Sequence, residues 1–357
     1  MKSVYIHIPF CNNICTYCDF CKLYYKKEWV DKYLDALELE IKENYKGEII
    51  ETLYIGGGTP SSLSLDELKK LFEILKTIKL SDSYEYTIEC NPDSMNNDKI
   101  LLMKEYGINR VSLGVETFNA KYLKLLNRKS SDVNNIISML KDNKITNINV
   151  DLMYALPGET MEELKDDIKK ILELDVPHIS TYSLIIEPNT KLYIDKVENI
   201  DEDLDYEMYT EIINSLSKYN HYEVSNFGKS GYESKHNLTY WNNEHYYGFG
   251  LGASGYIDNV RYENTRSLNN YLKGNYVLNK EELDIDVIKE NELILGFRKL
   301  EGISIEKYKE KYNEDILENE VVKQLLTKGK LINKDGFIRI DPKYTYTSNE
   351  ILINFLN

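Results

Sequence analysis

Apolar positions in the first half of the chain follow two spacings in alternation, short apolar runs and repeats of three to four residues. The short runs predict buried strands, and the longer repeats predict amphipathic helices. The expected strands cover residues 3–8, 52–55, 84–90, 110–115, 148–153 and 178–184. The expected helices cover residues 27–45, 96–106, 120–126 and 132–143, with two more that begin after Ser64 and Thr160. Such alternation predicts a parallel sheet with helices packed outside it.

Six strand–helix units are too few to close the eight-stranded barrel that such repeats build. The sequence therefore predicts an α/β fold, a partial (β/α)6 TIM-like barrel that stays open at one side. In barrels of this type the chemistry lies at the carboxyl ends of the strands. Cysteines, glycines and charged residues do follow the expected strands, so we look for a site at that edge.

The pattern loosens after residue 187, where a helix at 203–219 precedes a stretch rich in glycine and aromatic residues. Helical spacing returns at 288–300, and we expect a hairpin at 330–340 and a last helix at 349–356. This order predicts a small, mostly helical, winged-helix-like domain at the end. The expected division is a barrel core at 1–186, a barrel-completing segment at 187–280 and a C-terminal domain at 281–357.

Charge and composition exclude several classes of protein. The net charge is −15 and there is no long basic run, which argues against nucleic acid as a partner, even for a winged-helix-like module. The chain begins almost at once with strand-like residues and has no run of about 18 apolar residues, so we expect neither a signal peptide nor a transmembrane helix. Five cysteines, four of them close together, fit a metal site in the reducing cytoplasm.

Three closely spaced cysteines, Cys11, Cys15 and Cys18, follow the first expected strand. Clustered thiolates on a short loop bind either an iron–sulfur cluster or a zinc ion. Three ligands suit a four-iron cluster with one iron left open for a small molecule, whereas Cys21 would be the fourth ligand of a structural zinc. A disulfide framework is not expected, because nothing marks the chain as secreted.

The other expected strands end at glycines or charged residues. The segment GGGTP, residues 56–60, follows the second strand, where bare backbone would let a ligand approach or would simply make a tight turn. Four charged residues lie near later strand ends: Glu89, Glu116, Arg128 and Asp151. Such side chains can hold the hydroxyl, ammonium and carboxylate groups of a small metabolite, although each alone would be ordinary in a surface ion pair.

A histidine beside aromatic residues marks the segment HNLTYW, residues 236–241. An imidazole can ligate heme iron, and the rings of Tyr240 and Trp241 could stack on a porphyrin. The alternative is an ordinary aromatic corner in which His236 is hydrogen-bonded. The residues taken alone favour the packed corner.

In combination and in order, these motifs resemble the radical S-adenosylmethionine (SAM) enzymes, and among them the oxygen-independent coproporphyrinogen III oxidase or dehydrogenase family, HemN. The resemblance runs through YIHIPFC, GGGTP, ECNP, GVE, NR, DLMYALPG and HNLTYW, over nearly the whole chain. It is greatest with the heme-chaperone branch, HemW. Phe20 stands where the dehydrogenase has a fourth cysteine, and that enzyme's long extension before the first strand is missing.

By that resemblance, Cys11, Cys15 and Cys18 hold a [4Fe-4S] cluster. The positions that match a first SAM site are Tyr5, Gly57 and Glu89. The positions that match a second SAM site are Tyr17, Gly58, Thr59, Glu116, Arg128 and Asp151. Glu116 departs from the family, which usually has glutamine there. The candidates for contact with heme are His236, Tyr240 and Trp241.

The resemblance implies one of two functions. A chaperone would bind the cluster, SAM and heme, and would pass heme to respiratory acceptor proteins at the membrane surface, with the cluster supporting transfer or a homodimer. An enzyme would convert coproporphyrinogen III to protoporphyrinogen IX by radical decarboxylation of two propionates. We expect the chaperone, without decarboxylation, because of Phe20, Glu116 and the HNLTYW segment.

Overall fold

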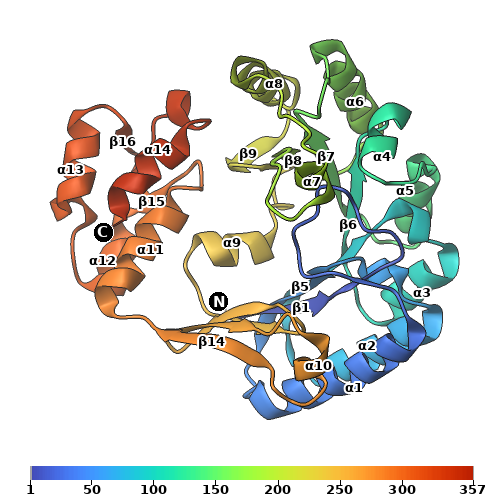
Figure 1. Cartoon of the computed structure of the whole chain (residues 1–357). Coiled ribbons are helices and arrows are strands. Elements are labelled where there is room, and N and C mark those ends of the chain that lie inside the picture. Colours follow the sequence, from blue (N-terminus) through green and yellow to red (C-terminus); the bar gives the residue numbers. More distant parts are fainter. Residues whose placement is uncertain (1, 357) are drawn as a thin grey trace.

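One wide, curved sheet organises the computed structural model, which describes residues 2–356 (Figure 1). Its central strands run parallel and lie side by side in chain order. They are β1 (Ser3–Ile8), β4 (Ile50–Gly57), β5 (Leu80–Cys90), β6 (Arg110–Glu116), β7 (Asn147–Tyr154) and β8 (His178–Ser183). The six strands predicted from the apolar runs are therefore present and parallel.

Helices cover the outer face of these strands, as the alternating pattern predicts (Figure 1). They are α1 (Lys27–Asn44), α2 (Leu65–Leu75), α3 (Asn97–Glu105), α4 (Ala120–Leu125), α5 (Val133–Asp142) and α6 (Met161–Glu173). Ser64 and Thr160 are the N-caps of α2 and α6, and each forms a capping box with the glutamate three residues later. These boxes satisfy amides that the start of a helix leaves unpaired.

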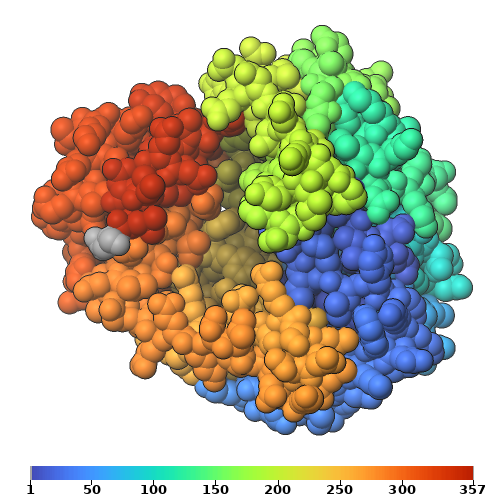
Figure 2. Space-filling view, viewed as in Figure 1, coloured from blue at the N-terminus to red at the C-terminus, as the bar shows by residue number. Residues whose placement is uncertain are grey.

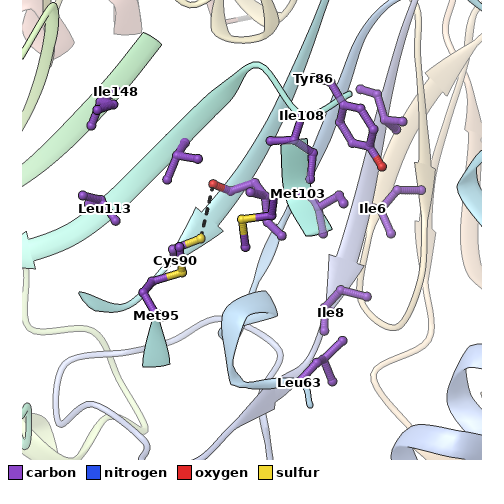
Figure 3. Packing of buried hydrophobic residues seen from close by; sticks show 14 of the residues in the cluster. Ile6, Ile8, Leu63, Tyr86, Cys90, Met95, Met103, Ile108, Leu113 and Ile148 are labelled. Carbon is purple, nitrogen blue, oxygen red and sulfur yellow. Dashed lines mark hydrogen bonds between the residues drawn. The ribbon is translucent and has the colours of Figure 1, made fainter. Parts of the chain in front are cut away.

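A continuous apolar core lies between the sheet and its helices (Figure 3). Ile6 and Ile8 of β1, Cys90 of β5 and Met103 of α3 are buried members of it. Because side chains alternate across a strand, Tyr5 and His7, which neighbour these isoleucines in β1, face the inside of the barrel.

Strands between residues 220 and 282 extend the sheet at both edges. Beyond β8, β10 (Asn226–Gly228) and β9 (Asn220–Glu223) pair antiparallel. Beyond β1, the added strands are β11 (Tyr246–Phe249), which is parallel, and the antiparallel β12 (Ser254–Ile257), β13 (Val260–Asn264) and β14 (Val277–Glu282). A Cβ at Gly248 would lie 1.8 Å from the carbonyl oxygen of Ser254, so β11 and β12 can approach only because glycine is there.

The part of the chain between β8 and β14 also contributes the helices α8 and α9. α8 (Glu202–Ser215) is the helix expected at 203–219 and packs against α6. The HNLTYW segment forms α9 (Lys235–Trp241), which Ser234 caps by accepting a hydrogen bond from the amide of Asn237. Figure 1 shows α9 between the sheet and the C-terminal part of the chain.

The C-terminal module, residues 285–355, has an apolar core of its own. Its helices are α11 (Ile285–Gly296), α12 (Ile305–Tyr312), α13 (Glu320–Thr327) and α14 (Ser348–Leu352), and its small sheet contains β15 (Ile303–Ser304), β17 (Phe337–Ile340) and β16 (Leu331–Lys334). The hairpin β16–β17 is the one predicted at 330–340. No helix among residues 2–356 combines the length and the apolar character needed to cross a membrane.

Candidate cluster and cofactor site

A cavity of about 500 Å³ lies at the carboxyl ends of the parallel strands, beside the cysteine loop that follows β1. This is the edge at which barrel folds of this class place their chemistry. Most of the residues selected from the sequence line it: Cys11, Cys15, Tyr17, Cys18, Gly57, Gly58, Thr59, Glu89, Glu116, Arg128 and Asp151. Tyr5, His236, Tyr240 and Trp241 do not line it.

The cysteine loop is anchored along its length although it is mostly irregular. It leaves β2 (Phe10–Cys11) and returns to β3 (Leu23–Tyr24), and these two short strands pair with each other. The amide of Thr16 donates to the carbonyl of Leu126 at 3.2 Å, and its own carbonyl accepts from the amide of Leu192 at 3.0 Å. Backbone bonds on both sides therefore fix the positions of the thiols between them.

Three thiols face the cavity, with Cys11 buried and Cys15 and Cys18 partly exposed. Burial raises the pKa of the Cys11 thiol to about 11, so a bound metal would be needed to make it a thiolate at neutral pH. Nη1 of Arg128 lies 3.5 Å from the sulfur of Cys15, as a hydrogen-bond donor. A guanidinium beside the thiols fits a site whose ligands carry negative charge.

Cys21 lies apart from the other three thiols. It is buried outside the cavity, where a Cβ at Gly252 would come within 3.0 Å of its sulfur. Its carbonyl oxygen lies 2.7 Å from Nε2 of His7. The fourth thiol that a tetrahedral zinc site would need therefore lies elsewhere than at the cavity.

Gly57 is the last residue of β4, and Gly58 follows it; both lie against the start of the cysteine loop. Gly57 has a φ of 112°, in the left-handed region, and a Cβ there would lie 2.6 Å from the ring of His7. A Cβ at Gly58 would lie 2.8 Å from the carbonyl carbon of Pro9 and 3.0 Å from the sulfur of Cys11. A side chain at either position would push apart the protein groups that shape the cavity.

Glu89 is held at the end of β5 by two donors. The hydroxyl of Tyr54 donates to Oε1 at 2.8 Å, and the amide of Gly57 donates to Oε2 at 3.0 Å. Burial raises the pKa of the Glu89 carboxyl above its ordinary value. A positively charged ligand group in the cavity would favour the ionised form instead.

Glu116 and Arg128 form a buried ion pair, with 3.3 Å between Oε1 and Nη1 and side-chain exposures of only 10% and 9%. Nη1 also lies 3.3 Å from the hydroxyl of Tyr17, and Nη2 donates to Oδ1 of Asn91 at 3.0 Å. The backbone of Glu116 has a φ of 66°, a conformation that is costly for a glutamate and that concentrates at functional sites. The carboxylate of Glu116 thus gives Arg128 a charged partner.

Asp151 is the third carboxyl of the cavity. Nδ2 of Asn149 donates to Oδ1 at 2.8 Å, and the Ser112 hydroxyl donates to Oδ2 at 3.5 Å. Burial raises the pKa of the Asp151 carboxyl to about 7, and the neighbouring charges of Glu116 and Glu89 add to this effect. Three carboxyls beside one guanidinium make a cavity that favours a ligand with cationic groups.

The residues expected to contact heme lie on α9, away from the cavity. The ring of His236 is buried, with Nδ1 2.7 Å from the hydroxyl of Thr52 and Nε2 2.8 Å from the hydroxyl of Tyr240. The ring stacks on Tyr54 at 4.8 Å between centroids. Burial lowers the pKa of His236 to about 3, so the ring is neutral. His236 is thus packed as an aromatic corner, while Trp241 faces Arg298 of the C-terminal module.

Tyr5 also lies behind the cavity wall. Its hydroxyl is 3.0 Å from Nδ1 of His7, and its ring centroid is 6.5 Å from that of His236. Sequence reasoning missed Tyr54 and Asn149, which position Glu89 and Asp151. A usable signal was available for Asn149, which lies two residues from Asp151 on β7 and so shares its face of the sheet, whereas Tyr54 is three residues from Gly57 and had no such signal.

Comparisons with known proteins agree with this geometry. The family model described as "Radical SAM superfamily" matches residues 5–171. The heme chaperone HemW of Lactococcus lactis is 40% identical over 99% of this chain and 97% of that protein, and HemW of Bacillus subtilis is 39% identical over 100% and 99%. In the structure of coproporphyrinogen III oxidase (HemN) from Escherichia coli, the same fold aligns with a TM-score of 0.87 and 21% identity, over 99% of this chain and 89% of that one. The predicted partial-barrel fold is confirmed, and the chain belongs to the heme chaperone HemW family of radical SAM proteins.

Proposed function

We propose that this protein is a heme chaperone that carries a [4Fe-4S] cluster, binds SAM and heme, and transfers heme to respiratory acceptor proteins. The observation that carries the proposal is the identity of 40% and 39%, over nearly the full length, with two proteins named heme chaperone HemW. The cavity supports it, because thiols, bare glycine backbone and carboxyls meet at one edge of the sheet.

Cys11, Cys15 and Cys18 would be the protein ligands of the cluster. When bound, such a cluster supplies one open iron and an electron for SAM. The part played by this chain is to anchor the loop, to keep Cys21 outside the cavity and to place Arg128 beside Cys15. Metal binding would take the proton from the Cys11 thiol, whose pKa burial raises to about 11.

The SAM-binding residues fall into two groups. Gly57 presents bare backbone, and Glu89 presents a carboxyl that can accept hydrogen bonds from an ammonium group, while Tyr5 supports this region through His7. A second small molecule would be held by the remaining cavity residues: Tyr17, Gly58, Thr59, Glu116, Arg128 and Asp151. Because Glu116 and Arg128 already pair with each other, we expect weaker binding at this second position.

The proposal also covers the heme contacts, the cellular location and the assembly of the protein. The prediction that His236, Tyr240 and Trp241 contact heme stays open to test, since His236 would have to leave Thr52 and Tyr240 to reach iron. We place the protein in the cytoplasm, where reducing conditions keep its five free cysteines as thiols. We place the acceptors at the membrane surface and expect a homodimer as the assembled form.

Heme transfer tests the proposal. Protein reconstituted anaerobically with iron and sulfide is loaded with hemin and mixed with membrane vesicles that contain heme-free respiratory acceptors. We expect heme to move to these vesicles, and to move more slowly from a variant in which the three loop cysteines are alanine. Heme that stays on the protein, or that leaves equally for vesicles without acceptors, would contradict the proposal.

A further inference from the structure

A second cleft, of about 640 Å³, lies where the C-terminal module meets the edge of the sheet. His221 and Tyr222 of β9 and Leu238 of α9 line one side, and Phe297 and Ile340 of the module line the other. Figure 2 shows a hollow between the module, in orange and red, and the yellow-green residues of the barrel. The volume is in the range of small-molecule sites, about 300–1,000 Å³.

Backbone bonds fix the two sides of this cleft relative to each other. The amide of Val224 donates to the carbonyl of Arg298 at 3.2 Å, and the amide of Leu300 donates to the carbonyl of Tyr222 at 3.1 Å. Lys299, between them, forms an isolated bridge with the β9 strand. The cleft is therefore preformed, which lowers the entropy cost of binding a ligand there.

Two cations line the cleft, Lys299 and Arg339, and neither forms an ion pair with a carboxylate of the described residues. Lys299 donates to the side-chain oxygen of Asn242 at 2.5 Å, and burial lowers its pKa against the opposing charges of Glu292, Glu301 and Glu244. Nε of Arg339 is buried without a hydrogen-bond partner. Two carboxylates also line the cleft, Glu233 and Glu301. Oε1 of Glu233 accepts a hydrogen bond from the side chain of Asn220, and its Oε2 accepts one from a backbone amide. The carboxylate of Glu301 attracts Lys299 electrostatically without forming an ion pair.

In a chain with a net charge of −15, many lysines of the barrel have carboxylate partners, as Lys27, Lys42, Lys70 and Lys170 do. Partly buried charges are normally paired, because an unpaired charge costs solvation free energy. The rest of the lining is largely apolar, with Leu238, Phe297 and Ile340 facing the same space. A ligand that satisfies this cleft has a broad apolar body and carboxylates on one side.

We propose that heme occupies this cleft, with its ring against the apolar wall and its propionates against Lys299 and Arg339. The inference rests on the proposed function, which supplies heme as the cargo. The HNLTYW helix would then contribute to two sites from opposite faces. Leu238 lines the cleft, whereas His236 points into the barrel. His221 adds an imidazole to the cleft wall, the type of side chain that heme iron accepts. Its Nε2 lies 3.3 Å from the carbonyl oxygen of Val224 and its ring stacks on Phe227 at 4.2 Å between centroids, so ligation would require this ring to leave Val224.

Hemin titration of the full-length, reconstituted protein tests the cleft, with absorbance as the readout. The variants are Lys299→Met and Arg339→Gln, with the charge-retaining Arg339→Lys as the conservative change. Lys334→Met is the matched control, because Lys334 is exposed on the same hairpin. Hemin dimethyl ester, which lacks the propionate charges, is the second ligand. Thermal unfolding and cluster absorbance show that each variant is folded.

Each loss of charge should raise the Kd for hemin about tenfold, since charged hydrogen bonds are among the strong ones. Arg339→Lys should retain most of the affinity, Lys334→Met should retain all of it, and the ester should bind all variants alike. Unchanged hemin affinity in Lys299→Met and Arg339→Gln would overturn the assignment of heme to this cleft, most clearly if His236→Gln abolished binding. A wild-type protein that bound no hemin would instead overturn the proposed function itself.

Discussion

At the scale of single residues, position 57 requires glycine because of a protein neighbour. A Cβ there would meet the ring of His7 at 2.6 Å, and the φ of 112° is itself strained for any other residue. His7 is fixed by Tyr5 and by the carbonyl of Cys21, so it cannot easily yield. A side chain at 57 would therefore move the amide that holds Glu89.

We predict that Gly57→Val lowers SAM affinity by about tenfold or more, a loss typical of a displaced charged hydrogen bond, while the three cysteines still bind their cluster. Equilibrium dialysis with SAM on reconstituted protein measures this. Gly274→Val is the control, because its φ of 80° carries similar backbone strain but a Cβ there meets nothing within 4 Å. Equal SAM affinity in Gly57→Val and wild type would remove this segment from the site.

Asp151 makes SAM binding depend on pH. Its pKa is raised to about 7, chiefly by burial and further by Glu116 and Glu89, so about a tenth of the carboxyl is ionised at pH 6 and most of it at pH 8. Cationic SAM favours the ionised form, and its affinity should rise up to about tenfold across this interval. Asp151→Asn should flatten the profile, whereas exposed Asp335→Asn should leave it unchanged. A profile with the same slope in Asp151→Asn would assign the titration to another group.

The raised pKa of Asp151 has the opposite effect on the folding stability of cluster-free protein, which falls as the pH rises. The folded state holds the Asp151 proton more tightly than the unfolded chain does. The contribution of this group is therefore full below a pH of about 4 and is lost as the pH rises through about 7. Removing the charge by Asp151→Asn should raise the melting temperature of cluster-free protein at pH 8 more than at pH 5.

At the scale of elements, backbone hydrogen bonds hold the cysteine loop so that three thiols face the cavity, while the thiol of Cys21 lies outside it. Replacing Cys11, Cys15 and Cys18 together by alanine should abolish the brown absorbance of reconstituted protein. Cys21→Ala should leave most of it, with about four irons per chain, since Cys21 packs against Gly252 outside the cavity. Stoichiometric zinc with no iron after reconstitution would defeat the cluster assignment.

Elements with a strong local pattern could be predicted, and strands that exist because they pair with a distant edge of the sheet could not. β1, β5 and β6 are apolar runs buried on the core side, and the capping boxes at Ser64 and Thr160 mark helix starts independently of the rest of the fold. By contrast, β11 reads Tyr-Tyr-Gly-Phe and exists because it pairs with the edge of β1. β14 is exposed along its whole length, so it has no apolar signal at all.

The same division holds for the site. The strand-end rule brings together Cys11, Glu89 and Asp151, which are far apart in sequence. It could not show that His236 is turned inward onto Thr52, because a helix of seven residues has no long apolar face from which to read its orientation. Nor could it find the cleft at Lys299, which depends on how the C-terminal module docks on β9.

At the scale of the whole molecule, the strand-end cavity and the cleft beneath the C-terminal module share no lining residue. The module has its own core and bonds to the barrel through the residues that follow α11 and through α11 and α12 themselves. Heme held in the cleft would thus be separate from SAM held in the cavity. Such an arrangement fits a carrier, whereas a decarboxylase must bring the propionates to the SAM site.

Hemin binding and coproporphyrinogen III decarboxylation, assayed on one anaerobically reconstituted preparation with SAM and a reductant, separate a heme carrier from an enzyme. We predict about one hemin bound per chain and no decarboxylated porphyrinogen above the level of cluster-free protein. Protoporphyrinogen IX formed over many turnovers, from protein that binds no hemin, would contradict this prediction and would assign the chain the activity of an oxygen-independent dehydrogenase.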